Sequence, residues 1–250
     1  MSRALDILFS CLALIVTSPF IAVCSLIIWA QDGKSPIYRA KRVGKNGEFF
    51  IMLKLRSMIW GAEQNQVDST KSTDNRITPI GKFTRKFKID EFPQFWNVLR
   101  GEMSLVGPRP NVQRETDIYT LAERNLLTVR PGITDIASIV FSDLAQILEP
   151  YPDANIAYNQ LVRPWKSRLS LVCIENASIK SNIIILYLTA IAVFNRKSAL
   201  IKINRILAKW NTDEKLQKVA LRNTSLTPHP PMGSNDIVEH RKQANHSHGC

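Results

Sequence analysis

The sequence predicts a mostly helical α/β catalytic domain, small and cytosolic, that is attached to a membrane by its N-terminus. Three observations lead to this prediction. The first is an uncharged apolar run over residues 7–30, and the second is the basic segment that follows it. The third is a stretch over residues 88–110 in which two adjacent acids precede an arginine held between two prolines. A chain of 250 residues has room for one such domain with a small appendage.

The apolar run is long enough to cross the hydrocarbon core of a bilayer. At about 1.5 Å per residue it reaches roughly 36 Å, against a core of about 30 Å. Ser18 and Pro19 stand at its middle, where proline removes one backbone hydrogen bond and disfavours helix at the preceding residue. From these residues alone, a kinked spanning helix is favoured over one that dips into the bilayer and returns, because membrane helices tolerate proline.

The segment after the apolar run is basic. Between Gln31 and Met58 there are seven Lys or Arg and two acids, and the positive-inside rule places such a flank in the cytosol, close to anionic lipid. Short strands are expected over 35–39 and 48–58, joined by a turn at 44–47 that contains two glycines. The four cysteines show no disulfide framework, which fits a reducing compartment.

The net charge of +12 indicates anionic partners, of which nucleic acid, lipid head groups and phosphorylated substrates are the main classes. No helix-turn-helix, zinc-finger or RNP-like aromatic pattern is visible, so nucleic acid is not expected as a partner.

Paired acids open the stretch around which the chain is organised. Asp90 and Glu91 precede apolar residues at helical spacing, with Pro93 in the expected first turn, so Asp90 is a candidate N-cap. Gly101 is expected to end the helix, and Arg109 stands in a rigid Pro-Arg-Pro turn. Ordinary helix capping and a structural corner would explain these residues without any chemistry. Together, however, carboxylates that can bind a divalent metal or attack phosphorus, and a guanidinium that suits phosphate oxygens, form a set for phosphoryl chemistry.

Five motifs carry a resemblance to a known family. They are Lys54-Leu-Arg-Ser-Met58, Asp90-Glu-Phe-Pro-Gln94, Asn97-Val-Leu99, Gly101-Glu-Met-Ser-Leu-Val-Gly-Pro-Arg-Pro110 and Val129-Arg-Pro-Gly-Ile-Thr134. The chain resembles the bacterial sugar transferases, the monotopic phosphoglycosyl transferases, from its N-terminus to about residue 205. This likeness divides the chain into a membrane helix (1–32), a transferase domain (33–205) and a polar tail (206–250) that is expected to be disordered.

The resemblance implies a reaction, its cofactor and its partners. A phospho-sugar is transferred from a nucleoside diphosphate sugar, such as a UDP-sugar, to polyprenyl (undecaprenyl) phosphate, as the first membrane step of exopolysaccharide, capsule or O-antigen synthesis. Asp90 is the implied nucleophile, and Glu91, with Asp90 as a second candidate ligand, holds Mg²⁺. The implied phosphate-binding residues are Lys54, Arg56, Arg85, Arg109 and Arg130.

The resemblance also bears on topology and location. Family members use a Ser-Pro break to form a re-entrant hairpin, which reverses the preference for a spanning helix at Ser18-Pro19. The protein is then expected at the bacterial inner membrane, against anionic lipids, with its catalytic domain on the cytoplasmic face; a homodimer is left open. The competing hypothesis is a catalytically inactive membrane scaffold.

Three further regions are less specific. After Thr134 this chain has Asp135-Ile-Ala-Ser138 where many family members have Gly-Trp-Ala, which puts donor specificity in doubt. Residues 183–194 are apolar but too few to span a bilayer, so an interfacial helix and a buried core helix are both open. A helix is expected between Pro110 and Arg124, and the polar residues 61–78 are expected to form a surface loop.

Overall fold

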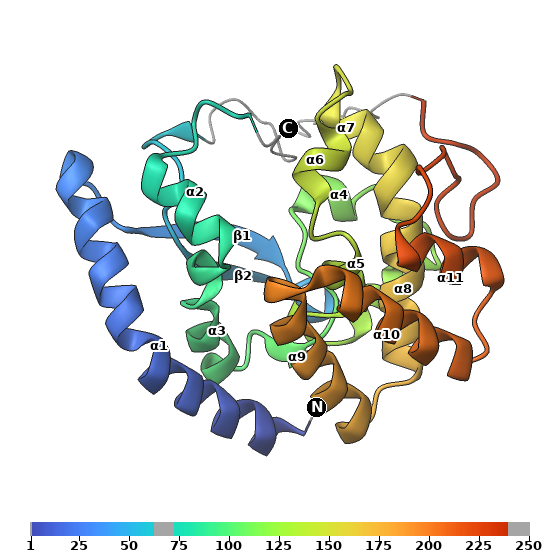
Figure 1. The fold of residues 1–250 in the computed structure, drawn as a ribbon, viewed down its shortest axis with the longest axis horizontal. Helices are drawn as coiled ribbons and strands as arrows, with labels where there is room; N and C mark the ends of the chain where they lie inside the picture. The colour runs from blue at the N-terminus through green and yellow to red at the C-terminus, as the bar shows by residue number, and fades with distance from the viewer. Residues whose placement is uncertain (1, 63–72, 240–250) are drawn as a thin grey trace, which may run out of the picture.

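The computed structural model describes residues 2–62 and 73–239 as one helical body with a long helix along one side (Figure 1). The α-helices are α1 (Arg3–Asp32), α2 (Pro79–Lys86), α3 (Gln94–Arg100), α4 (Gln113–Thr116), α5 (Ile136–Val140), α6 (Leu144–Leu148), α7 (Ala154–Ala157), α8 (Arg163–Glu175), α9 (Ile179–Phe194), α10 (Arg196–Lys209) and α11 (Glu214–Leu221). Short segments of 3-10 or π-helix are η1 (Lys45–Gly47), η3 (Ile89–Glu91), η4 (Glu123–Thr128) and η5 (Tyr158–Val162). The predicted surface loop and the end of the predicted tail fall partly on 63–72 and 240–250, which lie outside the described residues.

Two small sheets complete the predicted α/β class. Strands β1 (Ile37–Val43) and β2 (Phe49–Leu55) pair antiparallel, with Ile37 opposite Leu55, and η1 makes the turn between them. This confirms the hairpin expected from the sequence. Strands β3 (Ser104–Val106) and β4 (Gly132–Thr134) pair in parallel, with Ser104 opposite Gly132. This pairing brings the Pro108-Arg-Pro110 turn close to the Arg130-Pro-Gly132 turn.

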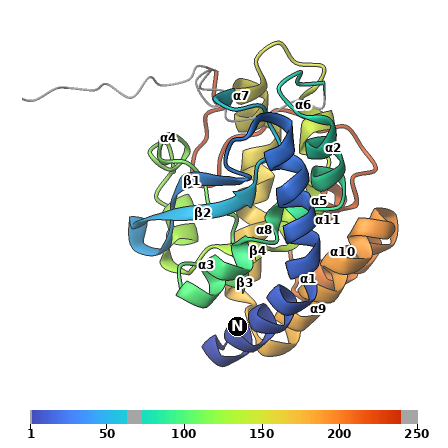
Figure 2. The same cartoon turned by 90° about the vertical axis from the view of Figure 1, so that its left-hand side faces the viewer.

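Helix α1 is continuous through Pro19, and it changes direction part-way along its length (Figures 1 and 2). Proline has no N–H for the carbonyl of Ile15, four residues earlier, and the hydroxyl of Ser18 donates to that carbonyl at 2.9 Å instead. The Ser-Pro pair therefore weakens the backbone ladder without ending the helix. By length and apolar composition α1 could cross a membrane, and little of its apolar surface is buried in the protein.

Both ends of α1 are fixed to the same body. At its start, Arg3 donates to the carbonyl of Leu99 at the end of α3 (2.7 Å), and the buried carboxylate of Asp6 accepts from Ser104 in β3 (2.9 Å). At its end, Asp32 pairs with Arg56, just after β2. Both ends of α1 therefore contact one domain, and the helix runs along the side of that domain between them.

The core lies between the C-terminal helices and the small sheets. Its fully buried side chains include Val98 from α3, Ile136 from α5, Leu169 from α8, and Ile203 and Leu207 from α10. Helix α9 contributes Ile185 and Leu188 to this core, as the core interpretation expects, while its other face stays exposed.

Asn97 ties the short helix α3 to β2. Its side chain accepts from the amide of Leu53 (2.9 Å) and donates to the carbonyl of Ile51 (2.7 Å). This clamp sets the helix that follows the two acids against the strand that carries Lys54.

Three sequence predictions need correction. Asp90 is not the N-cap of α3: both acids lie in the separate 3-10 turn η3, and α3 begins at Gln94 with Pro93 in its N-cap position, because Pro93 has no N–H to continue the backbone ladder. The region from 111 to 124 forms only the four-residue α4, turns and the start of η4. Residues 206–239 are not a structureless tail, since α10 continues to Lys209 and α11 buries Leu216 and Ala220 against the domain.

Candidate active site

The carboxylates of Asp90 and Glu91 are presented by a single tight turn. Lys88, which precedes it, adopts a left-handed conformation with φ of 59°, and the chain then turns through η3 into α3. Gly101 ends α3 with φ of 83°, as the sequence predicts. The acids therefore sit in a short, stiff segment between two helices, with Asp90 buried.

Glu91 is held by two cations. The carboxylate oxygen Oε1 accepts from Arg109 Nη2 at 2.6 Å and lies 3.5 Å from Lys54 Nζ. Burial alone would raise the pKa of Glu91, but Arg109 and Lys54 outweigh that effect and hold its pKa well below the usual range. Burial and the nearby Arg109 lower the pKa of Lys54 to about 8. Glu91 is thus an ionised carboxylate whose charge is already compensated.

Asp90 is in the opposite situation. Its Oδ1 is buried and has no hydrogen-bond partner among the residues that the structure describes. Burial, with a smaller contribution from the adjacent charge of Glu91, raises the pKa of Asp90. The two adjacent acids thus have different surroundings. Glu91 is paired with two cationic side chains, whereas one oxygen of Asp90 has no hydrogen-bond partner among the described residues.

Gly107 and Gly132 let the Pro108-Arg-Pro110 turn approach the Arg130-Pro-Gly132 turn closely. A Cβ atom on Gly132 would lie 2.1 Å from the amide nitrogen of Gly107, so the two backbones are in direct contact there. Gly132 N donates to Pro108 O at 2.9 Å and Gly107 N donates to Thr134 O at 3.0 Å. This pairing fixes Pro108 and Pro110 on either side of Arg109, whose other guanidinium nitrogens have no acceptor within the described ranges.

The other predicted phosphate-binding residues differ in where they lie. Arg85 donates to the hydroxyl of Ser57 at 2.8 Å and is close enough to Asp90 for the two charges to interact. Arg56 is buried and donates to Asp32 and to the carbonyl of Ser35, so its guanidinium holds the end of α1. Arg130 donates to the carbonyl of Gly101 at 2.9 Å and is otherwise exposed. The structure therefore brings Lys54, Arg85 and Arg109 to the carboxylates, and engages Arg56 and Arg130 elsewhere.

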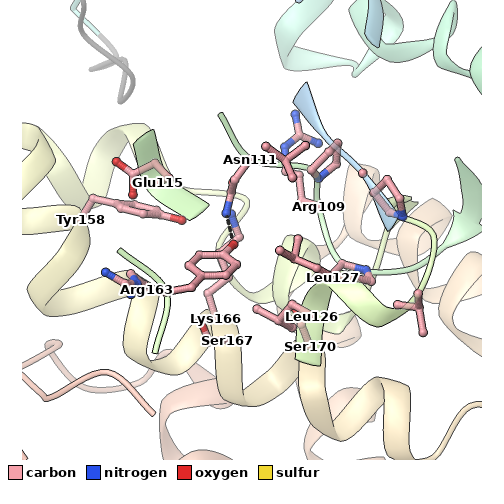
Figure 3. A pocket seen from close by; sticks show the side chains of 17 residues that line it. Arg109, Asn111, Glu115, Leu126, Leu127, Tyr158, Arg163, Lys166, Ser167 and Ser170 are labelled. Atoms are coloured by element: carbon pink, nitrogen blue, oxygen red, sulfur yellow. Dashed lines mark hydrogen bonds between the residues drawn. The ribbon is translucent and has the colours of Figure 1, made fainter. Parts of the chain in front are cut away.

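A small cavity of about 30 Å³ opens beside Arg109 (Figure 3). Its walls include Tyr158, Lys166 and Ser170, and Asn111 donates to the Tyr119 hydroxyl at 2.7 Å within it. Burial, followed by the nearby Arg109, lowers the pKa of Lys166 to about 8. A space of this size takes a water molecule or a single substituent of a ligand rather than a whole nucleotide.

The sequence reading missed Lys166 and also Arg42, whose pKa is lowered by burial and by Arg109. For Arg42 the sequence offered one indication, the basic segment in which it lies, and for Lys166 it offered none. Lys166 follows an Arg-Pro-Trp run on α8, and only the packing of that helix brings it to the cavity.

Asp135, where the chain departs from the family pattern, lies against the wall of this cavity. Its carboxylate accepts from the amide of Ser138 at 2.7 Å, capping α5, and from the hydroxyl of Ser170, which lines the cavity. Asp135 is buried and faces no solvent. The departure therefore changes the cavity wall through Ser170 rather than by direct contact.

The residues present fit a divalent cation that is shared with a ligand. The described part of the chain holds no group of three or more His, Cys, Asp or Glu that could bind a metal by itself. Mg²⁺, however, is commonly bound by one or two carboxylates together with substrate phosphates and water. The buried Asp90 oxygen, which has no partner among the described residues, and the ionised carboxylate of Glu91 are two candidate ligands of this kind.

Comparison with known proteins places this geometry in a family. The family model described as bacterial sugar transferase matches residues 1–196, which include α1, the acid pair and the Arg109 turn. The chain belongs to the bacterial sugar transferase family. The family resemblance expected from the sequence is thereby confirmed.

Curated relatives are identical to this chain at about a third of the aligned positions. The exopolysaccharide production protein ExoY of Sinorhizobium fredii is 36% identical over 152 residues, covering 55% of this chain and 67% of the relative. An enzyme of Aeromonas hydrophila, named UDP-N-acetylgalactosamine-undecaprenyl-phosphate N-acetylgalactosaminephosphotransferase, is 37% identical over 143 residues, covering 55% of this chain and 33% of the relative. Undecaprenyl-phosphate galactose phosphotransferase of Salmonella typhimurium is 35% identical over 154 residues, covering 54% of this chain and 32% of the relative.

Proposed function

We propose that this protein is a phosphoglycosyl transferase that moves a phospho-sugar from a UDP-sugar to undecaprenyl phosphate. The observation that carries the proposal is the asymmetry of the acid pair: Glu91 is clamped by Arg109 and Lys54, while Asp90 keeps a buried oxygen that has no partner in the described part of the chain. A carboxylate in that state suits nucleophilic attack, and cations beside it suit a diphosphate. The names of the relatives support the donor and acceptor classes.

In the proposed mechanism the reaction has two displacements at one phosphorus atom. An Asp90 oxygen attacks the phosphorus that bears the sugar, the bond to the nucleoside monophosphate breaks, and an aspartyl-phosphosugar forms. A phosphate oxygen of the polyprenyl acceptor then attacks the same phosphorus and releases Asp90 as a free carboxylate.

The cations of the site bind and orient the donor in this mechanism. Arg109, fixed between two prolines, holds a donor phosphate with the nitrogens that Glu91 does not use, and Lys54 adds a second positive charge. Mg²⁺ held by Glu91 and the donor phosphates would supply charge neutralisation there. Arg85 lies where it favours the ionised form of Asp90.

We further propose that α1 is re-entrant and that the domain lies on the cytoplasmic face of the inner membrane. Both ends of α1 contact the same domain, and Ser18-Pro19 weakens the ladder at its middle. A soluble donor and a lipid acceptor can meet only at the interface, where this arrangement would hold the site. The product would enter exopolysaccharide, capsule or O-antigen synthesis.

The test is a screen of UDP-sugars with undecaprenyl phosphate and Mg²⁺, reading release of nucleoside monophosphate by the purified full chain in nanodiscs. We expect release with at least one UDP-sugar and its loss in Asp90→Asn. A folded protein that releases no nucleoside monophosphate from any donor would favour the inactive scaffold.

A further inference from the structure

A second cavity, of about 280 Å³, lies between the start of α9 and the end of α10. Its residues differ from those around Arg109, so it is a separate site. Three isoleucines (Ile184, Ile185 and Ile206) give it apolar walls, and Lys180, Lys209 and Trp210 also line it. The two lysines are exposed, so their ammonium groups stand at the rim between an apolar interior and solvent.

The cavity carries uncompensated positive charge. Within residues 2–62 and 73–239, neither Lys180 nor Lys209 has a carboxylate within ion-pairing distance. The positive end of the α9 dipole adds to this potential, since Ser178 caps the helix one residue before its start. Two lysines that line one cavity without an acid favour an anionic occupant.

The surroundings of the cavity indicate that the anion belongs to a lipid. Ile179, Ile183 and Tyr187 follow one another at four-residue spacing on α9, and all three are about half exposed. At 16 residues α9 is too short to span a bilayer, so an apolar stripe of this kind suits a helix that lies along a membrane surface. In both views α9 lies beside the start of α1, the apolar helix (Figures 1 and 2).

We propose that this cavity binds the head group of an anionic glycerophospholipid. The lysines would neutralise its phosphate, Trp210 would lie at the level of the head groups, and the isoleucines would contact the first methylenes of its acyl chains. A volume of about 280 Å³ fits a phosphoglycerol head group and not a nucleotide sugar. The lipid would then hold the domain at a second point, away from α1.

The test uses quenching of Trp210 fluorescence by brominated lipid. The full chain is placed in nanodiscs of phosphatidylcholine that contain either dibrominated phosphatidylglycerol or dibrominated phosphatidylcholine, and the signal of Trp210→Phe is subtracted. We expect stronger quenching by phosphatidylglycerol. Each lysine near a membrane surface contributes about fivefold to the affinity for anionic lipid. The double variant Lys180→Gln with Lys209→Gln should therefore weaken the phosphatidylglycerol preference roughly 30-fold.

Matched variants make the test specific. Lys45→Gln with Arg124→Gln removes the same charge from exposed positions outside the cavity and should keep the preference, as should Lys180→Arg with Lys209→Arg. Equal quenching by the two lipids, an unchanged preference in the double glutamine variant, displacement by inorganic phosphate, or a stronger preference for undecaprenyl phosphate would each overturn the proposal. No donor or acceptor reaction is involved, so the result is independent of the transferase mechanism.

Discussion

Replacing Arg109 by lysine separates charge from geometry in the site. Arg109 donates to Glu91 at 2.6 Å, and its other guanidinium nitrogens have no acceptor among the described residues. Lysine keeps the positive charge but has a single ammonium on a flexible stem, so it cannot bond the carboxylate and a phosphate in the same planar arrangement.

The expected magnitude follows from the role proposed for Arg109. Losing one preorganised donor to the developing charge of a transition state costs about 2.7–4 kcal/mol, which is roughly 100- to 1000-fold in rate. The bond to Glu91 contributes less to folding, because the side chain of Arg109 is 28% exposed and solvent screens its charge. We therefore expect kcat/KM to fall by about 100-fold or more, while the melting temperature changes little.

The assay is nucleoside monophosphate release by Arg109→Lys in nanodiscs, with Arg100→Lys as control. Arg100 lies on α3 with a side chain that is 61% exposed, so its variant should keep activity within about twofold of the unmodified chain. Near-normal turnover of Arg109→Lys would refute the reasoning and leave the Pro-Arg-Pro turn as a structural corner.

Three further predictions concern charge, stability and topology. Because the pKa of Lys54 is lowered to about 8, its ammonium is lost as pH rises through that value; kcat/KM for the donor should fall there, and Lys54→Arg should remove this step from the pH profile. Glu123→Gln leaves the buried Arg163 without its carboxylate partner and should lower the free energy of unfolding by about 3 kcal/mol in urea titrations, whereas a loss below about 1 kcal/mol would contradict the account. A Ser2→Cys reporter in a chain otherwise free of cysteine should resist impermeant thiol reagents added outside intact cells, and ready labelling would restore a spanning α1.

Local signals predicted the elements that depend on neighbours in sequence. The β1–β2 hairpin followed from a turn with two glycines between two short runs typical of strands, and the end of α3 followed from Gly101, which takes the left-handed conformation that glycine favours. The start of α3 was predicted too early, because the left-handed Lys88 leads into a separate turn, η3, and Pro93 takes the N-cap position of α3. Spacing alone does not distinguish such a turn from the first turn of a helix.

Residues that long-range packing brings together could not be predicted from spacing. Lys166 lies near Arg109 only because α8 packs against α5 and η4, and no local pattern marks it. The pKa of Asp90 is raised and that of Glu91 is lowered, and this difference also depends on which cationic side chains the fold places beside each acid. Helix α11 was missed because its two buried residues, Leu216 and Ala220, are a short four-residue repeat within a polar segment.

The covalent role of Asp90 is the central claim, and intact-mass spectrometry tests it most directly. The full chain is mixed with an accepted UDP-sugar and Mg²⁺ in the absence of undecaprenyl phosphate. The account predicts release of about one nucleoside monophosphate per active site, a mass increase equal to one phospho-sugar that maps to the peptide containing Asp90, and no adduct in Asp90→Asn. An unmodified protein that releases nucleoside monophosphate only when both substrates are present would contradict it and favour direct transfer.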